Sequence, residues 1–503
     1  MTIPVPTPEQ QAVIDWQGTH LVVNAFAGTG KTATLVRFAE ANPDTKMLYL
    51  AFNRAVRDEA EQKFPFNVEC KTSHQLAWPS QGKHYKHRLV SQIRVTEVAK
   101  ALNTRYWQLV QQVMATLNRF LTSPDPAVSL IHYRGDDKDG RLNPARVIQG
   151  AGFIWQKMRD TQSSFPVTHD AYLKLYQLSA PDLTTRYRTI LFDEAQDANP
   201  VTQALVLGQD CQVILVGDRH QQIYRFRGAD NALDAPALKH ADRLWLTRSF
   251  RFGPQVAAVA NALLALDGET KPVTGNGEDE VLPPGRIQAP HKAVLSRTVA
   301  GVIDSALTAA GQQQAIFWVG GIEGYRTEQL EDLYWFSVDR TKKLKYPHLL
   351  RDYTDYDDYC RIAKSTEDIE MLQSVSLLER YFPLPQKLNT LRQFTVTDEH
   401  RAAVTVSTAH RAKGLEWPVV VLSEDYPDIF DPKLSGADRQ DEINLLYVAA
   451  TRARKTLVLN AVTVEALTRR QQENPEIPPD GPGTHSHKPH NHEITPGDEK
   501  QNV

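Results

Sequence analysis

The sequence predicts an α/β fold with two parallel-sheet cores in tandem, each carrying a mainly helical insertion. Short apolar runs recur directly before polar or glycine-rich segments, which is typical of buried parallel strands. These runs are residues 21–23, 47–50, 189–192, 213–216, 404–406, 419–422 and 457–459. Helix-like stretches lie between them, for example at 32–41, 256–266 and 442–453. This alternation favours α/β layers with functional loops at the strand ends.

Two helix-like interruptions divide the strands into two groups. A chain of 503 residues is also too long for one compact core. The predicted units are a first core at 1–82 and 187–248, its insertion at 83–186, a second core at 249–340 and 400–470, and a reduced second insertion at 341–399. Because the second insertion has only about 60 residues, we expect a fixed extension of the second core, without a swivelling autoinhibited state. Residues 471–503, rich in Pro, Gly and His and without an aromatic residue, are predicted to be a disordered tail.

Composition excludes several classes of protein. No apolar run approaches the roughly 20 residues that a membrane-spanning helix needs, so we expect a cytoplasmic protein without a membrane partner. Cys70, Cys211 and Cys360 are far apart, which argues against a disulfide framework or a zinc site. A net charge of -3 gives no global attraction to nucleic acid, so any such contact has to come from local basic and aromatic surfaces.

A phosphate-binding loop follows the first predicted strand. Residues 25–32 read Ala-Phe-Ala-Gly-Thr-Gly-Lys-Thr and lead into a helix, the context expected of a P-loop, although Ala25 replaces the usual glycine. Its glycines let backbone N–H groups approach phosphates, while Lys31 can reach the β and γ oxygens and Thr32 can ligate Mg²⁺. The strand and helix around the loop argue against a chance glycine-rich turn. The predicted nucleotide-binding residues here are Ala27, Gly28, Thr29, Gly30, Lys31 and Thr32.

The second half of an ATPase site follows the apolar run 189–192. Asp193 is placed to hold the Mg²⁺ shell, and Glu194 can orient and deprotonate the attacking water. The alternative is an acidic surface turn, which the preceding apolar run and the upstream P-loop make a poor explanation. ATP and Mg²⁺ are therefore the predicted cofactors.

With these two motifs in order, the chain resembles the UvrD/Rep branch of the superfamily 1 DNA helicases over residues 8–455. Within that branch it is most similar to the F-box DNA helicases, although the sequence contains no F-box. The resemblance implies two RecA-like P-loop NTPase cores and an ATP-dependent motor that moves 3′→5′ on single-stranded DNA. It places Gln10 on the adenine, with the adjacent Gln11 as an alternative, and Phe250 against the same base. Glu416, at the end of a segment resembling motif V, joins the nucleotide site.

The same resemblance supplies three groups that face the γ-phosphate. Gln221 lies in a segment resembling motif III, Arg251 in one resembling motif IV, and Arg452 in one resembling motif VI. Permanently charged, planar guanidinium groups stabilise a phosphoryl group in transfer, and arginines from a second core make hydrolysis depend on cleft closure. A surface ion pair is the alternative for each arginine.

A motor that moves along any sequence needs base stacking and phosphate contacts more than base-edge recognition. Phe52 resembles the motif Ia aromatic residue, and Tyr224 and Phe226 resemble residues that stack on bases. Phe226 replaces a common tryptophan, and its smaller ring stacks less strongly. The histidines could contact DNA or could be ordinary structural residues. The predicted DNA-binding residues are Phe52, Asn53, His74, Tyr224, Phe226, Arg227 and His410.

Two basic stretches and a histidine cluster allow more than one interpretation. The first stretch could track phosphates or be a solvated helix face: it contains Lys83, Lys86, Arg88, Arg94, Lys100 and Arg105, against Glu97 alone. The second is followed by an acidic run at 352–358, which weakens its case; it contains Lys342, Lys343, Lys345 and Arg351. The tail histidines are more often incidental than metal ligands; they are His485, His487, His490 and His492.

The sequence therefore predicts an ATP- and Mg²⁺-dependent DNA helicase or translocase acting on single strands and on single-strand/duplex junctions, in repair, recombination or genome defence. One alternative is a translocase that strips bound proteins with little unwinding. Another is a nucleotide-gated module that recruits a nuclease or repair protein. Because only about fifty residues follow motif VI, we expect any nuclease to be a separate chain.

Overall fold

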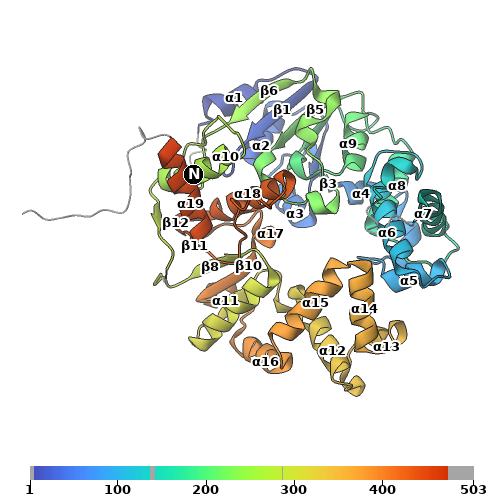
Figure 1. Ribbon diagram of the computed structural model, residues 1–503. Coiled ribbons are helices and arrows are strands. Elements are labelled where there is room, and N and C mark those ends of the chain that lie inside the picture. Colours follow the sequence, from blue (N-terminus) through green and yellow to red (C-terminus); the bar gives the residue numbers. More distant parts are fainter. Residues whose placement is uncertain (1–4, 136–141, 286, 474–503) are drawn as a thin grey trace, which may run out of the picture.

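The computed structural model describes residues 5–135, 142–285 and 287–473 (Figure 1). It contains two six-stranded sheets in which every pair of neighbouring strands is parallel. The first has the order β3-β2-β4-β5-β1-β6, from β1 (His20–Ala25), β2 (Met47–Ala51), β3 (Val68–Thr72), β4 (Thr189–Phe192), β5 (Gln212–Gly217) and β6 (Asp242–Leu246). The second has the order β7-β12-β11-β8-β10-β9, from β7 (Glu280–Leu282), β8 (Lys292–Ser296), β9 (Ile316–Trp318), β10 (Val404–Thr408), β11 (Trp417–Leu422) and β12 (Ala453–Val458). The predicted fold class is confirmed.

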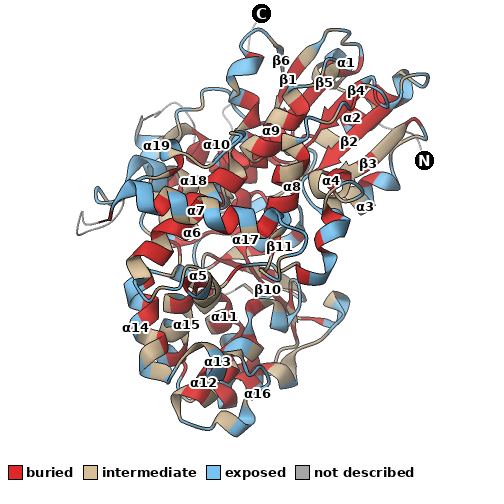
Figure 2. Ribbon diagram, turned by 90° about the vertical axis from the view of Figure 1, so that its right-hand side faces the viewer, coloured by how far each residue is buried: buried red, intermediate tan, exposed pale blue. Residues whose placement is uncertain are grey.

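Helices cover both faces of the first sheet, which explains why its strands are apolar on both sides (Figure 2). Leu21, Val22 and Val23 of β1 are all fully buried, for example, although neighbouring side chains point to opposite faces. α1 (Pro8–Ile14) and α2 (Lys31–Ala41) pack together near β1 and β6, and α9 (Pro200–Leu207) connects β4 to β5. The loops after β1, β4 and β5 consequently open at one edge of the sheet, where parallel strands end together.

The helix predicted at 442–453 is wrong at its C-terminal end. α18 (Gly436–Ala450) stops three residues earlier, and β12 begins at Ala453. The turn between them is held by Thr451, whose hydroxyl donates to the carbonyl of Tyr447 at 2.7 Å. This early stop places Arg452 in a turn at the sheet edge, a position that helical periodicity could not give.

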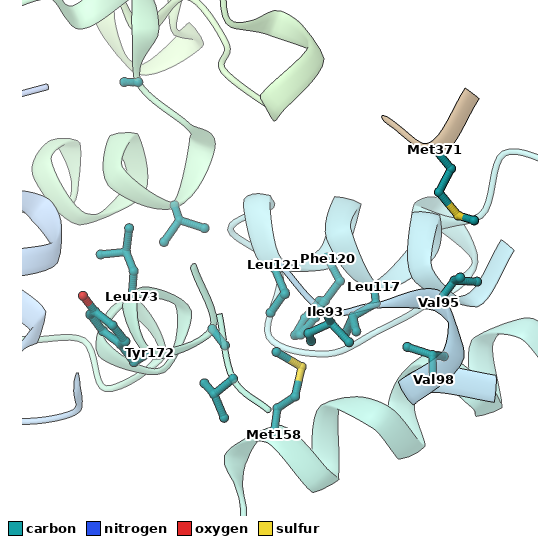
Figure 3. Close-up of a cluster of buried hydrophobic side chains, with 14 of the residues drawn as sticks. Ile93, Val95, Val98, Leu117, Phe120, Leu121, Met158, Tyr172, Leu173 and Met371 are labelled. Atoms are coloured by element: carbon teal, nitrogen blue, oxygen red, sulfur yellow. The ribbon is translucent and has the colours of Figure 1, made fainter. Parts of the chain in front are cut away.

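The first helical region packs around an apolar cluster that continues into the first sheet. Its main helices are α4 (Ser73–Ala77), α5 (Val95–Ala101), α6 (Trp107–Thr122), α7 (Pro144–Arg159) and α8 (His169–Leu178). Figure 3 shows Leu117, Phe120 and Leu121 of α6 gathered near Met158 of α7. The amphipathic pattern of α6 explains this arrangement, because its buried residues recur at three- and four-residue spacing.

The second helical region is attached to the second core. It consists of α12 (Thr327–Ser337), α13 (His348–Asp352), α14 (Tyr356–Thr366), α15 (Ile369–Arg380) and α16 (Leu384–Phe394). α16 packs on α11 (Val299–Gly311) of the core and buries Leu384, Leu388 and Leu391 completely. Since α12 also packs on α15 and α16, the helical layer begins before residue 341. Removing the predicted insertion alone would therefore expose apolar surface on both α11 and α12.

The two helical regions also contact each other. α14 packs against α6, and Arg94 forms an ion pair with the largely buried carboxylate of Asp352. Met371 of α15 lies toward Val95 of α5 (Figure 3). Within the described residues, no helix combines the length and the apolar character that crossing a membrane requires.

Candidate nucleotide and nucleic-acid site

The loop between β1 and α2 lies directly against the second core. Gly28 and Gly30 have φ values of 75° and 80°, a left-handed conformation that other residues adopt only with strain. A Cβ on Gly28 would lie 2.5 Å from Ser249 Oγ and 2.7 Å from Arg251 Cβ. Thr29 closes the loop by donating its hydroxyl to the carbonyl of Phe26 at 2.8 Å. A side chain at Gly28 would therefore both strain the backbone and collide with the second core.

Two hydroxyl groups donate to the carboxylate that follows β4. Thr32 Oγ1 donates to Asp193 Oδ2 at 2.9 Å, and the hydroxyl of Tyr49 donates to the same oxygen at 2.7 Å. Burial, together with the neighbouring charge of Glu194, raises the pKa of Asp193. Mg²⁺ prefers oxygen ligands of this kind, and a buried pair of carboxylates favours a nearby cation. Thr32 and Asp193 thus fit a Mg²⁺ ion.

Glu194 lies beside Lys31 at the entrance of the loop. Its backbone has a φ of 51°, and its Oε1 is 3.4 Å from Lys31 Nζ. Burial alone would raise the pKa of Glu194, but the charges of Lys31 and Lys413 and a hydrogen bond from Gln196 bring it down to about 2. The carboxylate is consequently ionised at neutral pH and can accept a hydrogen bond from a water molecule.

The two predicted arginine fingers lie close to each other and to Glu194. Arg251 donates through Nε to Glu416 at 2.7 Å and through Nη1 to the carbonyl of Thr451 at 3.2 Å. Arg452 is almost wholly buried, and burial together with the charge of Arg251 lowers its pKa to about 9, against the opposing effect of Glu194. The guanidinium group of Arg452 stays charged at neutral pH. Two buried or half-buried cations side by side favour an anion between the cores.

Gln10 and Phe250 both lie next to Gly30. A Cβ on Gly30 would be 3.0 Å from Gln10 Nε2 and 4.0 Å from the Phe250 ring, and Gln10 donates to the carbonyl of Thr29 at 3.3 Å. Phe250 leaves 47% of its surface exposed, and the guanidinium of Arg248 lies 5.8 Å from the centre of its ring. Gln11 instead bonds to Asp15 at the surface. Of the two glutamines, Gln10 is the one that faces the loop.

A cluster of aromatic rings extends across both cores. Phe52, after β2, stacks on Tyr224, after β5, with centroids 5.1 Å apart and planes 15° apart. His410, on α17 (Ala409–Ala412) of the second core, lies 5.6 Å from Phe226 and accepts a hydrogen bond at its backbone carbonyl from the Tyr224 hydroxyl at 3.0 Å. Phe226 is 70% exposed. These four residues, named the ring cluster below, form an aromatic surface suited to sequence-independent stacking.

Comparison with known proteins identifies the chain's relatives. Residues 151–235 match the UvrD/REP helicase N-terminal domain, and residues 403–460 match the UvrD-like helicase C-terminal domain. The chain is 33% identical over 502 residues to F-box DNA helicase 1 of Gallus gallus, covering 90% of this chain and 49% of that protein. It is 31% identical over 503 residues to F-box DNA helicase protein 1 of Schizosaccharomyces pombe, covering 90% and 57%. The chain therefore carries both an N-terminal and a C-terminal domain of the UvrD-like helicases.

More distant relatives are DNA helicases too. ATP-dependent DNA helicase PcrA of Bacillus subtilis is 24% identical over 426 residues, covering 58% of this chain and 57% of that protein. The chain spans about half the length of the F-box relatives that it matches. The two family matches fall on the segments that carry β4, β5, β10, β11 and β12, so they include the acidic strand end and three of the four ring-cluster residues, Tyr224, Phe226 and His410.

Sequence reasoning missed several polar groups that join the two helicase cores. The hydroxyl of Tyr447 on α18 accepts from the N–H of Ala27 at 3.1 Å and donates to Asp218 at 3.0 Å. Gln221 Nε2 donates to the same carboxylate at 2.7 Å. The only signal in the sequence was a tyrosine within the otherwise apolar stretch of α18. The predicted γ-phosphate sensor Gln221 is thus held by the second core through Tyr447 and Asp218.

Lys413 was also missed, as was its partner Asp197. It forms an ion pair with the buried Asp197 and donates to the carbonyl of Gln221 at 2.6 Å. Burial raises the pKa of Asp197 to about 6 even though Lys413 lowers it. His220, next to Gln221, contacts two carboxylates that follow α10 (Pro254–Leu266). Its Nδ1 is 2.6 Å from Asp267, and its Nε2 is 3.2 Å from Glu269. The segment after β5 is therefore held from several sides.

Two of the predicted DNA-binding residues outside the ring cluster, His74 and Asn53, have structural contacts of their own. His74 packs against His169 and Tyr172 of α8, and its Nε2 is 3.5 Å from Asp170. These contacts favour the structural alternative. Asn53 caps α3 (Arg54–Glu61) by accepting from the N–H of Val56 at 2.9 Å. The side chain of Arg227 and the tail histidines lie outside the described residues.

Neither interpretation of the first basic stretch, phosphate tracking or a solvated helix face, holds for Arg88. Arg88 is buried and donates to four backbone carbonyls between residues 157 and 165, so it cannot track phosphates. Arg94 pairs with Glu97 and Asp352. In the second stretch, Lys343 lies over the ring of Trp335 and Lys345 pairs with Glu328. These four residues are thus engaged in contacts within the protein, which composition does not reveal and which distinguishes them from the remaining lysines of the two stretches.

Proposed function

We propose that the chain is an ATP- and Mg²⁺-dependent motor that moves 3′→5′ along single-stranded DNA and opens single-strand/duplex junctions. One observation carries this proposal: the phosphate loop and the ring cluster are both built across the same two cores. Closing the cleft around a nucleotide would move Arg251 and Arg452 toward the loop, and the same motion would move His410 relative to Phe52. The direction rests on the family resemblance alone.

The residues suggest how hydrolysis would proceed. Thr32 and Asp193 would hold a Mg²⁺ ion, which when bound neutralises charge on the phosphates. Lys31, which now contacts Glu194, would contact the terminal phosphate, and Glu194 would then accept a proton from the attacking water. Arg251 would exchange its contact with Glu416 for one with the γ-phosphate. The guanidinium of Arg452, whose charge acts on that of Arg251, is already held by hydrogen bonds to the backbone carbonyls of Val448 and Leu415.

The test is ATP hydrolysis with and without single-stranded DNA, followed by translocation on strands labelled at either end. Stimulation by DNA and movement toward the 5′ end of the strand support the proposal. An ATPase rate indifferent to DNA would instead favour a nucleotide-gated module that recruits a separate nuclease or repair protein. Displacement of a bound protein without unwinding of a flanked duplex would favour a stripping translocase.

A further inference from the structure

A short basic helix lies at the start of the first helical region, outside the ring cluster. The 3₁₀-helix η1 (Gly82–Arg88) has seven residues, longer than most helices of this type. With three residues per turn, positions i and i+3 share a face, and Gly82, Tyr85 and Arg88 all point inward and are buried. The positions between them are exposed and basic in type: Lys83, His84, Lys86 and His87.

The inward face fixes the helix rigidly. A Cβ on Gly82 would lie 2.5 Å from the ring of Trp78, so a larger residue at this position would displace that ring. The hydroxyl of Tyr85 donates to the carbonyl of Arg159 at 2.8 Å. The guanidinium of Arg88 lies 5.1 Å from the centre of the Tyr85 ring and donates to four carbonyls. The outward face is thus presented on a fixed support.

The outward face has no protein partner within the described residues. None of its four side chains forms an ion pair or a hydrogen bond there, in contrast to Arg88 and Arg94 nearby. The chain as a whole has a net charge of -3, so this unpaired basic surface is not a consequence of overall composition. An unpaired cation on a rigid element loses little conformational freedom when it binds an anion.

We propose that this face, the η1 basic face, binds the sugar–phosphate backbone of a nucleic acid. The inference rests on the proposed function, which supplies DNA as the substrate. Lysine amines and imidazole N–H groups donate to phosphate oxygens without reading bases, as a translocating motor requires. The same chemistry suits a single strand beyond the ring cluster or the duplex next to a junction, and the experiment separates these two sources.

The test compares Lys83→Ala/Lys86→Ala with Lys364→Ala/Lys387→Ala. The control removes two lysines that are likewise exposed, on α14 and α16. Binding of a labelled single strand and of a single-strand/duplex junction is measured by fluorescence anisotropy over a salt series. Loss of two phosphate contacts should reduce the slope of log K against log salt by about 1.4 on a single strand or by about 1.8 on duplex. The control should keep the wild-type slope.

An ATP hydrolysis assay distinguishes failure of this inference from failure of the proposed function. In Lys83→Ala/Lys86→Ala, the maximal DNA-stimulated rate should stay at the wild-type value while the DNA concentration for half-stimulation rises. If wild-type protein shows no stimulation, the proposed function fails, but the salt slopes still report on the η1 basic face. Equal slopes for the wild type and for Lys83→Ala/Lys86→Ala on both DNA substrates would overturn the inference.

Discussion

Tyr447 offers the sharpest test of how the nucleotide site is held together. Replacement by Phe keeps the ring, which packs fully buried in α18, and removes a single oxygen. Burial and the charge of Asp218 raise the pKa of this phenol well above its ordinary value, so the hydroxyl is a permanent donor to Asp218. The variant leaves the buried N–H of Ala27 without its acceptor and takes one donor from Asp218.

The size of the effect follows from those two contacts. An unsatisfied buried polar group costs about 1–3 kcal/mol, and the free energy of unfolding should fall by about that amount. Because Asp218 also orients Gln221, we expect kcat for DNA-stimulated ATP hydrolysis to fall roughly 5- to 150-fold, the same free energy expressed as a rate. KM for ATP should change much less, since the phosphate contacts of the loop remain.

Urea unfolding and steady-state ATPase assays measure the two effects separately. Tyr426→Phe is the matched control, because Tyr426 is also buried in the second core and its hydroxyl forms, among the described residues, a single hydrogen bond, to the carbonyl of Leu295 at 3.4 Å. A Tyr447→Phe protein that loses stability yet keeps the kcat of the control would refute the reasoning. Tyr447 would then be a packing residue with no influence on Gln221.

Three further predictions concern the same machinery. Lys31→Ala and Glu194→Gln should both abolish turnover, but nucleotide titration should find lost binding only in Lys31→Ala, because Glu194 acts on water; equal loss of binding contradicts the role of Glu194 as base. Phe52→Ala and Phe226→Ala should each remove about 1–3 kcal/mol of base stacking, so that translocation per ATP falls before hydrolysis does; unchanged coupling in both variants assigns these rings to the core. Lys413→Met removes a charge that lowers the pKa of Glu194, so this pKa rises from about 2 and the acid limb of the pH–rate profile moves to higher pH; an unmoved limb contradicts the electrostatic role of Lys413.

The pH dependence of stability differs between the buried carboxylates Glu194 and Asp197. The pKa of Glu194 is lowered in the folded protein, so its contribution to stability is present above its ordinary pKa and is lost as the pH falls toward about 2. Asp197 behaves oppositely. Its folded pKa is raised to about 6, so its contribution is present at low pH and is lost as the pH rises through about 6.

The sequence alone determined the elements whose signal is local. The strand before the P-loop, the glycines with left-handed φ, and the apolar run before Asp193 all follow from neighbouring residues, since side-chain periodicity and backbone strain act over a few positions. The order of motifs along the chain also sufficed to recognise the family resemblance. The predicted nucleotide residues do come together, although their roles are still to be tested.

Only the tertiary structure decided which polar groups meet across the two cores. Tyr447 and Ala27 are 420 positions apart, and Lys413 and Asp197 are 216 apart, distances over which no local pattern operates. The same holds for Arg88, whose charge suggested a surface position but whose guanidinium satisfies buried carbonyls. Burial and pairing depend on what the rest of the chain packs against each residue. That is why composition could not separate Arg88 from the lysines that remain exposed beside it.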